Sequence, residues 1–258
     1  MSERLSARES EQFHTHGWVR LPGAFSAADA AAMRDAAWSG LAAQGIMRDD
    51  PSTWRMERPQ HLQHLKSDPA FRAVGSERTI AAIDELLAGQ PWKRPADWGS
   101  FFLVFPSERP WDLPAAGWHL DHDYAGPLTP PKGLKVHAMF GDVAPQAGGM
   151  AIVSASHRLV HRWFQDHPPR AGARAAELRG SVHRHPYVRD LCTPGDPETR
   201  RARFHDRVED VDGIPLQVLE NTAEAGDVIL MHPLLLHAPP VAHAGTMPRF
   251  LLNKDLFV

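Results

Sequence analysis

The stretch AGDVILMHPLLLHAPP, residues Ala225 to Pro240, shows the local pattern that decides the fold. Its Gly-Asp pair is typical of a turn, and the apolar run VILM after it is typical of a short buried strand. His232 ends this run immediately before a proline, and His237 lies where a strand could restart. Similar short runs, separated by glycine, proline and aspartate, follow residue 98: SFFLVFP, LKVHAMFGDV, GGMAIVSASH, GIPLQVLEN and RFLLNKDLF. The pattern predicts a β-sandwich or barrel.

Two alanine-rich or amphipathic segments before these strands predict helices. In FSAADAAAMRDAAWSGLAAQG, Ser26 has the position of an N-cap and Asp29 follows three residues later, which is a capping-box pattern. In SERTIAAIDELLAG, the apolar residues recur on one face and Gly89 marks the end. The strands are therefore expected to be flanked by helices.

A long segment, residues 158–207, interrupts the strand pattern. It has little clean periodicity, many prolines and more arginines than acids. Long segments of this kind in compact domains are often functional, and we interpret it as an insertion between strands, a lid with some helix in it. The chain is then expected to be one domain, residues 1–258, with N-terminal helices at about 26–90 and a β core at about 98–157 and 208–258.

Composition excludes several classes of function. The formal net charge is −3 and the pI is near 6.6, so we expect neither a nucleic-acid nor a membrane partner. No apolar run approaches the roughly 18 residues that span a bilayer. The single cysteine, Cys192, permits no internal disulfide, and together with the polar start of the chain this favours a cytoplasmic, reducing environment. The sequence makes no prediction of oligomeric state.

The stretch GWHLDHDYAG, Gly117 to Gly126, concentrates side chains that can bind a metal. On a strand, residues two apart share a face, so His119 and Asp121 are expected to project together and His122 to the other side. A pair of Asp121 and Asp123 would instead form a hard oxygen site. His-x-Asp is two thirds of the facial triad of non-haem iron(II) oxygenases. The residues alone leave its third ligand open between the two histidines of the opening stretch.

Four motifs in this order, WHLDHD, GGMAIVSASH, AGDVILMHPLLLHAPP and RFLLNKDLF, resemble the phytanoyl-CoA dioxygenase family of iron(II)/2-oxoglutarate oxygenases. The start, FHTHGWVRLPGAFSAADAAAMRDAAW, is also similar to the opening of that family. The resemblance covers nearly the whole chain and is weakest at residues 158–207. It implies a mainly β fold with flanking helices, built on a double-stranded β-helix (jelly-roll, cupin-like) core. It also implies iron(II), 2-oxoglutarate as co-substrate, and O₂.

The resemblance assigns the iron to His119, Asp121 and His237, and so prefers His237 to His232. The implied reaction converts 2-oxoglutarate to succinate and CO₂ while an unactivated C–H bond of a small molecule is hydroxylated or otherwise oxidised. Related halogenases lack the carboxylate ligand, so the presence of Asp121 argues for oxygenation over halogenation.

Two further residues are implied to bind the co-substrate. Arg249 follows His237 by twelve residues, and its guanidinium suits the far carboxylate of 2-oxoglutarate. His137, in LKVHAMFGDV, is expected near the same molecule. The family often has a serine or threonine where this chain has Pro239, so that hydroxyl must be replaced from elsewhere or by water.

The substrate is the least constrained part of the prediction. The arginine-rich insertion favours an anionic or polar small molecule. Candidate contacts are Asp123 and Tyr124, after the ligand pair, and Trp54 and Arg55, in the segment between the N-terminal helices that we expect to line the entrance.

Two other classes of function remain open. A metal-dependent cupin-type isomerase or hydrolase that does not use 2-oxoglutarate would share the three ligands but would not need Arg249. A non-catalytic binding protein with a degenerate metal site is disfavoured because the three expected ligands are intact.

Overall fold

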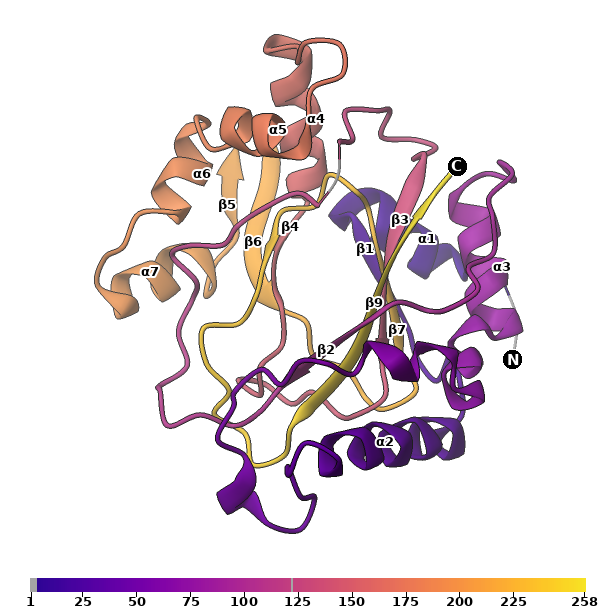
Figure 1. Cartoon of the computed structure of the whole chain (residues 1–258). Helices are drawn as coiled ribbons and strands as arrows, with labels where there is room; N and C mark the ends of the chain where they lie inside the picture. The colour runs from indigo at the N-terminus through magenta and orange to yellow at the C-terminus, as the bar shows by residue number, and fades with distance from the viewer. Residues whose placement is uncertain (1–3, 122) are drawn as a thin grey trace.

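The computed structural model describes residues 4–121 and 123–258 and contains two antiparallel β-sheets that face each other (Figure 1). The larger sheet has the strand order β1-β7-β3-β9-β2, and the smaller has β5-β6-β4-β8. This arrangement confirms the predicted mainly β, double-stranded β-helix core. The strands are β1 (Trp18–Leu21), β2 (Ser100–Val104), β3 (Gly133–Met139), β4 (Ala151–Ser154), β5 (Glu209–Val211), β6 (Ile214–Glu220), β7 (Val228–Met231), β8 (His237–Ala238) and β9 (Arg249–Phe257).

Strand β3 shows how the larger sheet separates two environments. All of its residues are buried, but alternate side chains face opposite sides. Val136 and Ala138 pack outward with the core that the N-terminal helices share, whereas Met139 packs inward with a small core between the sheets. Lys135 and His137 share the inward face with Met139. The strand therefore directs two polar side chains into the space between the sheets.

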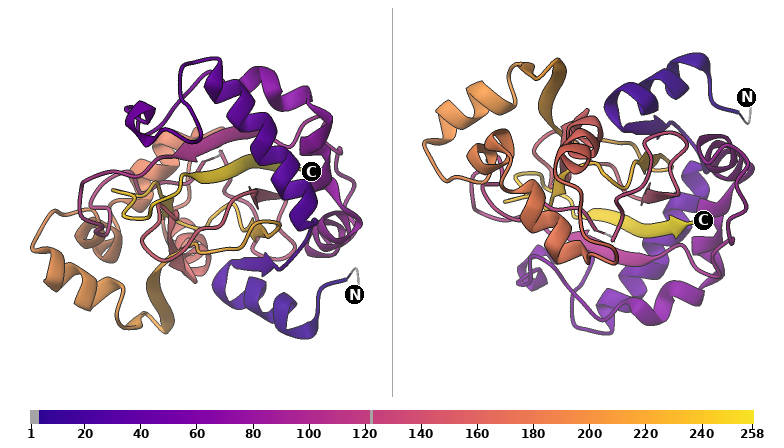
Figure 2. Two further views of the ribbon diagram at one scale, coloured as in Figure 1. Left: turned by 90° about the horizontal axis from the view of Figure 1, so that it is seen from below. Right: turned by 90° about the horizontal axis from the view of Figure 1, so that it is seen from above.

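Helices cover the outer face of the larger sheet. The extensive apolar core on this face joins residues of β1, β2, β3, β7 and β9 to the N-terminal helices, which lie along one flank in Figure 2. The capping box predicted at Ser26 is present, with Asp29 as its partner. A helix that the sequence did not predict, α1, precedes β1. These elements are α1 (Ala7–His16), α2 (Ala27–Ala42), η1 (Pro51–Thr53), η2 (Gln63–Ser67), η3 (Pro69–Gly75) and α3 (Glu77–Leu86).

The segment at residues 158–207 forms a second helical layer, on the outer face of the smaller sheet. Its apolar residues, such as Leu159 and Leu191, join one buried core with Val153 of β4 and Leu216 of β6. Its helices are short, which explains why the sequence showed little periodicity there. They are α4 (Ser156–Asp166), α5 (Ala175–Val182), α6 (Pro186–Leu191) and α7 (Pro197–Phe204). No helix in the described ranges is long and apolar enough to span a membrane.

The Gly-Asp turn before β7 ties the N-terminal segment to the sheet. Asp227 is 4% exposed, and its carboxylate accepts hydrogen bonds from the backbone N–H groups of Gly23 at 2.9 Å and Glu224 at 3.1 Å. Gly226 has φ +107°, and a Cβ at this position would lie 2.5 Å from the carbonyl oxygen of Phe25. The turn therefore requires glycine for space and aspartate for its hydrogen bonds.

We expect Asp227→Ala to lower the free energy of unfolding by about 1–3 kcal/mol, because two backbone N–H groups lose their acceptor. Urea denaturation measures this change. The matched control is Asp206→Ala at an exposed aspartate, which should shift the stability by less than about 0.5 kcal/mol. Equal stability of the two variants would contradict the role given to the turn.

Candidate metal centre

His119, Asp121 and His237 come together at the edge of the smaller sheet. His119 forms a β-bridge with His237, in which each backbone N–H donates to the other's carbonyl oxygen at 3.0 and 3.3 Å. Trp118 and Leu120 alternate with the two ligand residues and are buried in the core beneath the α4–α7 layer. This alternation turns His119 and Asp121 inward together, as the sequence predicted.

The three side chains converge closely. Asp121 Oδ1 lies 3.1 Å from His119 Nε2, and Oδ2 lies 3.1 Å from His237 Nε2. One ligand atom from each residue falls within 4.8 Å of the others, and within the described residues this is the group of potential metal ligands that the structure brings together. His122 lies outside the described residues.

Each histidine is oriented through its other ring nitrogen. His119 Nδ1 donates to the carbonyl oxygen of Gly117 at 2.6 Å, and His237 Nδ1 donates to that of Leu235 at 2.9 Å. A neutral imidazole carries one N–H, so these contacts leave the Nε2 lone pairs directed at Asp121. Electron-rich atoms that converge in this way fit a metal ion between them, and the carbonyl contacts are the outer support that metal-bound histidines have.

The expected charge states also suit a metal. Burial raises the pKa of Asp121, but its contacts with His119, His237 and the charged Lys135 lower it well below its usual range. Burial lowers the pKa of His237. An ionised carboxylate and a neutral imidazole are the forms that bind metal.

His232 is directed elsewhere. Its Nδ1 accepts from the backbone N–H of Leu234 at 3.0 Å, and its Nε2 lies 3.2 Å from the carbonyl oxygen of Leu128. Its ring packs against those of Phe13 and His157. The structure therefore places His237, and not His232, with the other two ligands.

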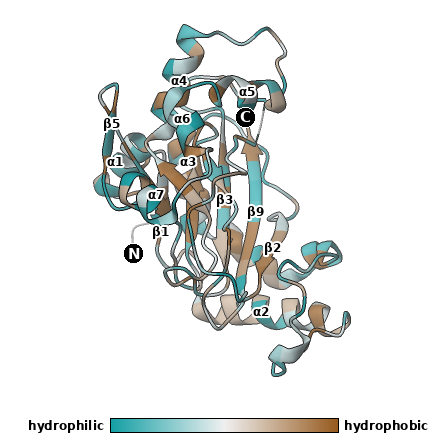
Figure 3. Ribbon diagram, turned by 90° about the vertical axis from the view of Figure 1, so that its left-hand side faces the viewer, coloured by the Kyte–Doolittle hydropathy of each residue, from teal (hydrophilic) through white to brown (hydrophobic). Residues whose placement is uncertain are grey.

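His119, Asp121 and His237 line a cavity of about 490 Å³ between the sheets. Along its wall, strand β9 changes from hydrophobic to hydrophilic residues (Figure 3). The lining residues are Arg58, Gln60, Gln63, Ser100, Phe101, Phe102, Leu103, Val104, His119, Asp121, Lys135, Met150, His237, Pro239, Pro240, Arg249 and Asn253. None of the described residues of α4–α7 is among them, so the lid predicted at 158–207 has no contact with the cavity to support it.

Arg249 is a buried cation that needs an anion. It is 2% exposed, and its guanidinium donates to the carbonyl oxygens of Gly148 at 2.5 Å and Phe102 at 3.3 Å. The Nε atom of Arg249 has no hydrogen-bond partner, and the guanidinium forms no ion pair with any described residue. Burial lowers the pKa of Arg249 to about 9, with a smaller contribution from Arg58. A carboxylate in the cavity would compensate this desolvated charge.

His137 is a second buried polar group without a hydrogen-bond partner among the described residues, on the inward face of β3 but not among the residues that line the cavity. It is fully buried on β3, opposite Asn253 of β9, and neither ring nitrogen has a hydrogen-bond partner within the described chain. Burial, followed by the charges of Lys135, His237 and Arg249, lowers the pKa of His137 well below its usual value. A neutral imidazole in this position can bond a ligand held between the triad and Arg249.

The structure places the predicted substrate contacts away from the cavity. The Tyr124 hydroxyl donates to the carbonyl oxygen of Pro127 at 2.7 Å within its own loop. Asp123 pairs with Arg174 at 3.1 Å, at the start of α5. Trp54 packs against Trp38 and Phe105, and Arg55 is exposed. The segment that carries Trp54 does reach the cavity, but through its later residues Arg58, Gln60 and Gln63.

Sequence reasoning missed Lys135. This lysine is 5% exposed, lines the cavity and contacts the Asp121 carboxylate. The sequence marked it only as a charged residue inside the otherwise apolar start of LKVHAMFGDV. Lysine is rarely buried without a partner, so its place in this strand could have indicated a contact with an acid.

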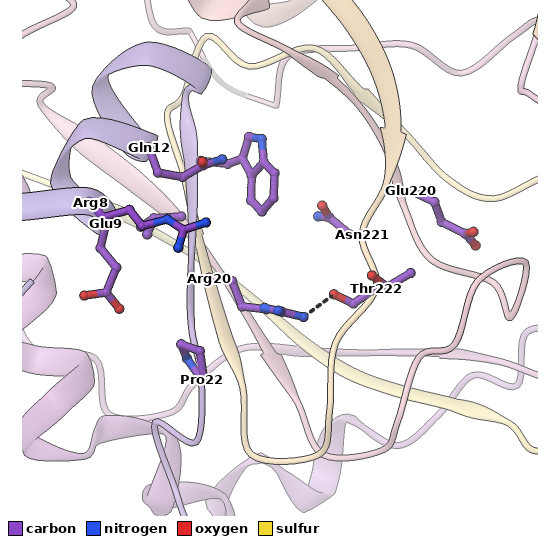
Figure 4. Close-up of a pocket in the computed structure, with 10 residues that line it drawn as sticks. Arg8, Glu9, Gln12, Arg20, Pro22, Glu220, Asn221 and Thr222 are labelled. Carbon is purple, nitrogen blue, oxygen red and sulfur yellow. Dashed lines mark hydrogen bonds between the residues drawn. The ribbon is translucent and has the colours of Figure 1, made fainter. Parts of the chain in front are cut away.

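A separate hollow of similar size lies between α1, β1 and the end of β6. Figure 4 shows Arg8 and Arg20 on one side and Asn221 and Thr222 on the other, with Arg20 donating to the carbonyl oxygen of Thr222 at 3.5 Å. The described residues that line it are all different from those around the triad.

A double-stranded β-helix that holds a His-Asp-His cluster and a buried arginine defines the class of non-haem iron, 2-oxoglutarate-dependent enzymes. The sequence matches the model of the phytanoyl-CoA dioxygenase (PhyH) family over residues 13–240. The chain belongs to this family, whose cofactors are iron and 2-oxoglutarate, and the predicted resemblance is confirmed. No protein with a curated description matches the sequence.

Solved structures share the fold at low sequence identity. HygX from Streptomyces hygroscopicus, with nickel and 2-oxoglutarate bound, is 16% identical with a TM-score of 0.56, covering 98% of this chain and 87% of its own. The epimerase SnoN, with Fe³⁺, α-ketoglutarate and nogalamycin RO, is 20% identical with a TM-score of 0.57, covering 97% and 82%. The carbocyclase SnoK, from nogalamycin biosynthesis, is 15% identical with a TM-score of 0.50, covering 99% and 85%.

We expect His237→Ala to weaken Ni(II) binding by more than about tenfold, because loss of a direct ligand should exceed the effect of losing outer support. Calorimetric titration of the metal-free protein measures the affinity. His232→Gln is the matched control and should bind Ni(II) as the wild type does, with folding of both variants checked by circular dichroism. The reverse pattern would contradict the assignment of His237.

Proposed function

We propose that this protein hydroxylates an unactivated C–H bond of a small-molecule substrate, with conversion of 2-oxoglutarate to succinate and CO₂. The observation that carries the proposal is Arg249, a buried guanidinium without an acidic partner among the described residues, on the same cavity as the His-Asp-His cluster. A cation in this state is costly unless the protein binds an anion there.

Each residue of the site has a separate role in this proposal. When bound, iron(II) and 2-oxoglutarate supply the activation of O₂ and the oxidising power. His119, Asp121 and His237 hold the metal, and Arg249 binds the far carboxylate of the co-substrate. His137, whose ring nitrogens have no partner among the described residues, would donate a hydrogen bond to the co-substrate in place of the hydroxyl absent at Pro239. The walls of the cavity exclude bulk water from the reacting atoms.

The remaining cavity surface supports a polar small molecule as substrate. Gln60, Gln63, Ser100 and Asn253 offer hydrogen-bonding groups, and Phe102 offers an apolar surface. Bound small molecules in the fold neighbours agree with this class: hygromycin B in HygX, 17% identical, and nogalamycin RO in SnoN. Arg58 at the cavity wall, rather than the arginines of α4–α7, is the cation that an anionic substrate would meet.

Hydroxylation is one of several outcomes that follow C–H cleavage, and the fold neighbours include an epimerase and a carbocyclase. Asp121 supports oxygenation over halogenation, since halogenases lack this carboxylate. Turnover under ¹⁸O₂ decides the outcome: hydroxylation labels the substrate-derived product as well as succinate, whereas epimerisation or ring closure labels succinate alone.

The second candidate function is a metal-dependent isomerase or hydrolase that does not use 2-oxoglutarate. It would use the same three ligands, and the cavity would suit it equally well. An enzyme of this kind would have no anionic co-substrate to pair with the buried guanidinium of Arg249. We therefore rank this function second.

We expect Arg249→Ala to raise the KM for 2-oxoglutarate by at least about 30-fold, because a buried charge partner is worth about 2–5 kcal/mol. A panel of polar small molecules is first screened for one that supports succinate formation. The rate of succinate formation at varied 2-oxoglutarate concentration then gives the KM. Arg48→Ala, which removes an exposed arginine paired with Asp35, should leave the KM unchanged. Activity that persists in Arg249→Ala without 2-oxoglutarate would favour the isomerase or hydrolase.

A further inference from the structure

Lys135, which lines the cavity, contacts oxygen atoms of three side chains. Its ammonium contacts Oδ2 of Asp121, and it lies 3.1 Å from Oδ1 of Asp255 and 3.1 Å from Oδ1 of Asn253. The ammonium donates a hydrogen bond to Asn253 and forms ion pairs with the carboxylates of Asp121 and Asp255. Lys135 is opposite Asp255 in the pairing of β3 with β9, and therefore both strands fix its position.

A lysine in this position is costly to the fold. It is 5% exposed, and removing an ammonium from water costs several kcal/mol before its partners compensate. An apolar residue would suit the interior between the sheets better, as Met139 does four residues later on the same face of β3. The ammonium is therefore best explained by what it does to Asp121.

The two oxygens of Asp121 have different surroundings. Oδ1 faces His119, whereas Oδ2 faces both His237 and the ammonium of Lys135. The positive charge of the ammonium beside Oδ2 attracts that oxygen and repels a metal cation from it. Oδ1 is therefore the oxygen available to a metal. The contact at Oδ2 prevents the carboxylate from rotating into a position where both oxygens would bind the metal.

We propose that Lys135 is a positioning residue that keeps Asp121 a one-oxygen ligand. A carboxylate that binds through both oxygens takes two positions on the metal, and a facial triad must leave room for a two-oxygen co-substrate and for O₂. Asn253 and Asp255 support Lys135 from β9. This inference rests on the proposed function, and it adds the residue that keeps a coordination position open.

The test is an anaerobic titration of the protein with iron(II) and then with 2-oxoglutarate, followed by the visible charge-transfer band of the chelate. Lys135→Met removes the ammonium at nearly the same volume. We expect its iron(II) affinity to be equal or higher, because a nearby positive charge is lost, and its 2-oxoglutarate affinity to fall at least about tenfold. Lys135→Arg retains a cation and should recover most of that loss.

The matched control is Lys254→Met, at the residue of β9 that lies between Asn253 and Asp255. Lys254 faces the other side of the sheet and pairs with Asp97 at 3.4 Å, so its loss should leave both affinities unchanged. If Lys135→Met does not fold, as judged by circular dichroism, Lys135→Gln carries the same expectation.

Two results would overturn the inference alone. One is a normal band and a normal 2-oxoglutarate affinity in the Lys135 variants. The other is a weaker iron(II) affinity with normal 2-oxoglutarate binding once iron is saturating, which would make Lys135 a general support of the site. A wild type that gives no band would contradict the proposed function, and this inference with it.

Discussion

The carboxylate of Asp121 receives contacts from both sheets. His119 and His237 approach it from the edge of the smaller sheet, and Lys135 reaches it from β3 of the larger one. These groups converge only if the two sheets close on each other at a fixed spacing. The bridge between His119 and His237 sets one side of that spacing, and the pairing of β3 with β9 sets the other.

The placement of the helices follows from this requirement. Each sheet has an apolar outer face, and each is covered by its own helical layer, from the N-terminal segment or from α4–α7. The space between the sheets can then be left partly polar. Lys135, His137 and Arg249 lie there although each is costly to bury. We interpret this cost as stability given up for a site that binds a metal and a dicarboxylate.

The sequence predicted the parts of the site that obey local rules. Strand alternation paired His119 with Asp121, and the motif order chose His237 and Arg249, which the structure places on one cavity. It did not predict Lys135, whose role depends on strand register with Asp255. The sequence also assigned the substrate contacts to Asp123 and Tyr124, because they follow His119 and Asp121 directly in the chain. Tyr124 instead bonds within its own loop, and Asp123 pairs with Arg174 at the start of α5.

We propose that His119, Asp121, His237 and Arg249 together form one site for iron(II) and 2-oxoglutarate. Anaerobic addition of iron(II) and 2-oxoglutarate to the wild-type protein tests it most directly. We expect a visible charge-transfer band that requires both additions and that is lost in Asp121→Ala. A protein that binds iron(II) at the triad but gives no band with 2-oxoglutarate would contradict it.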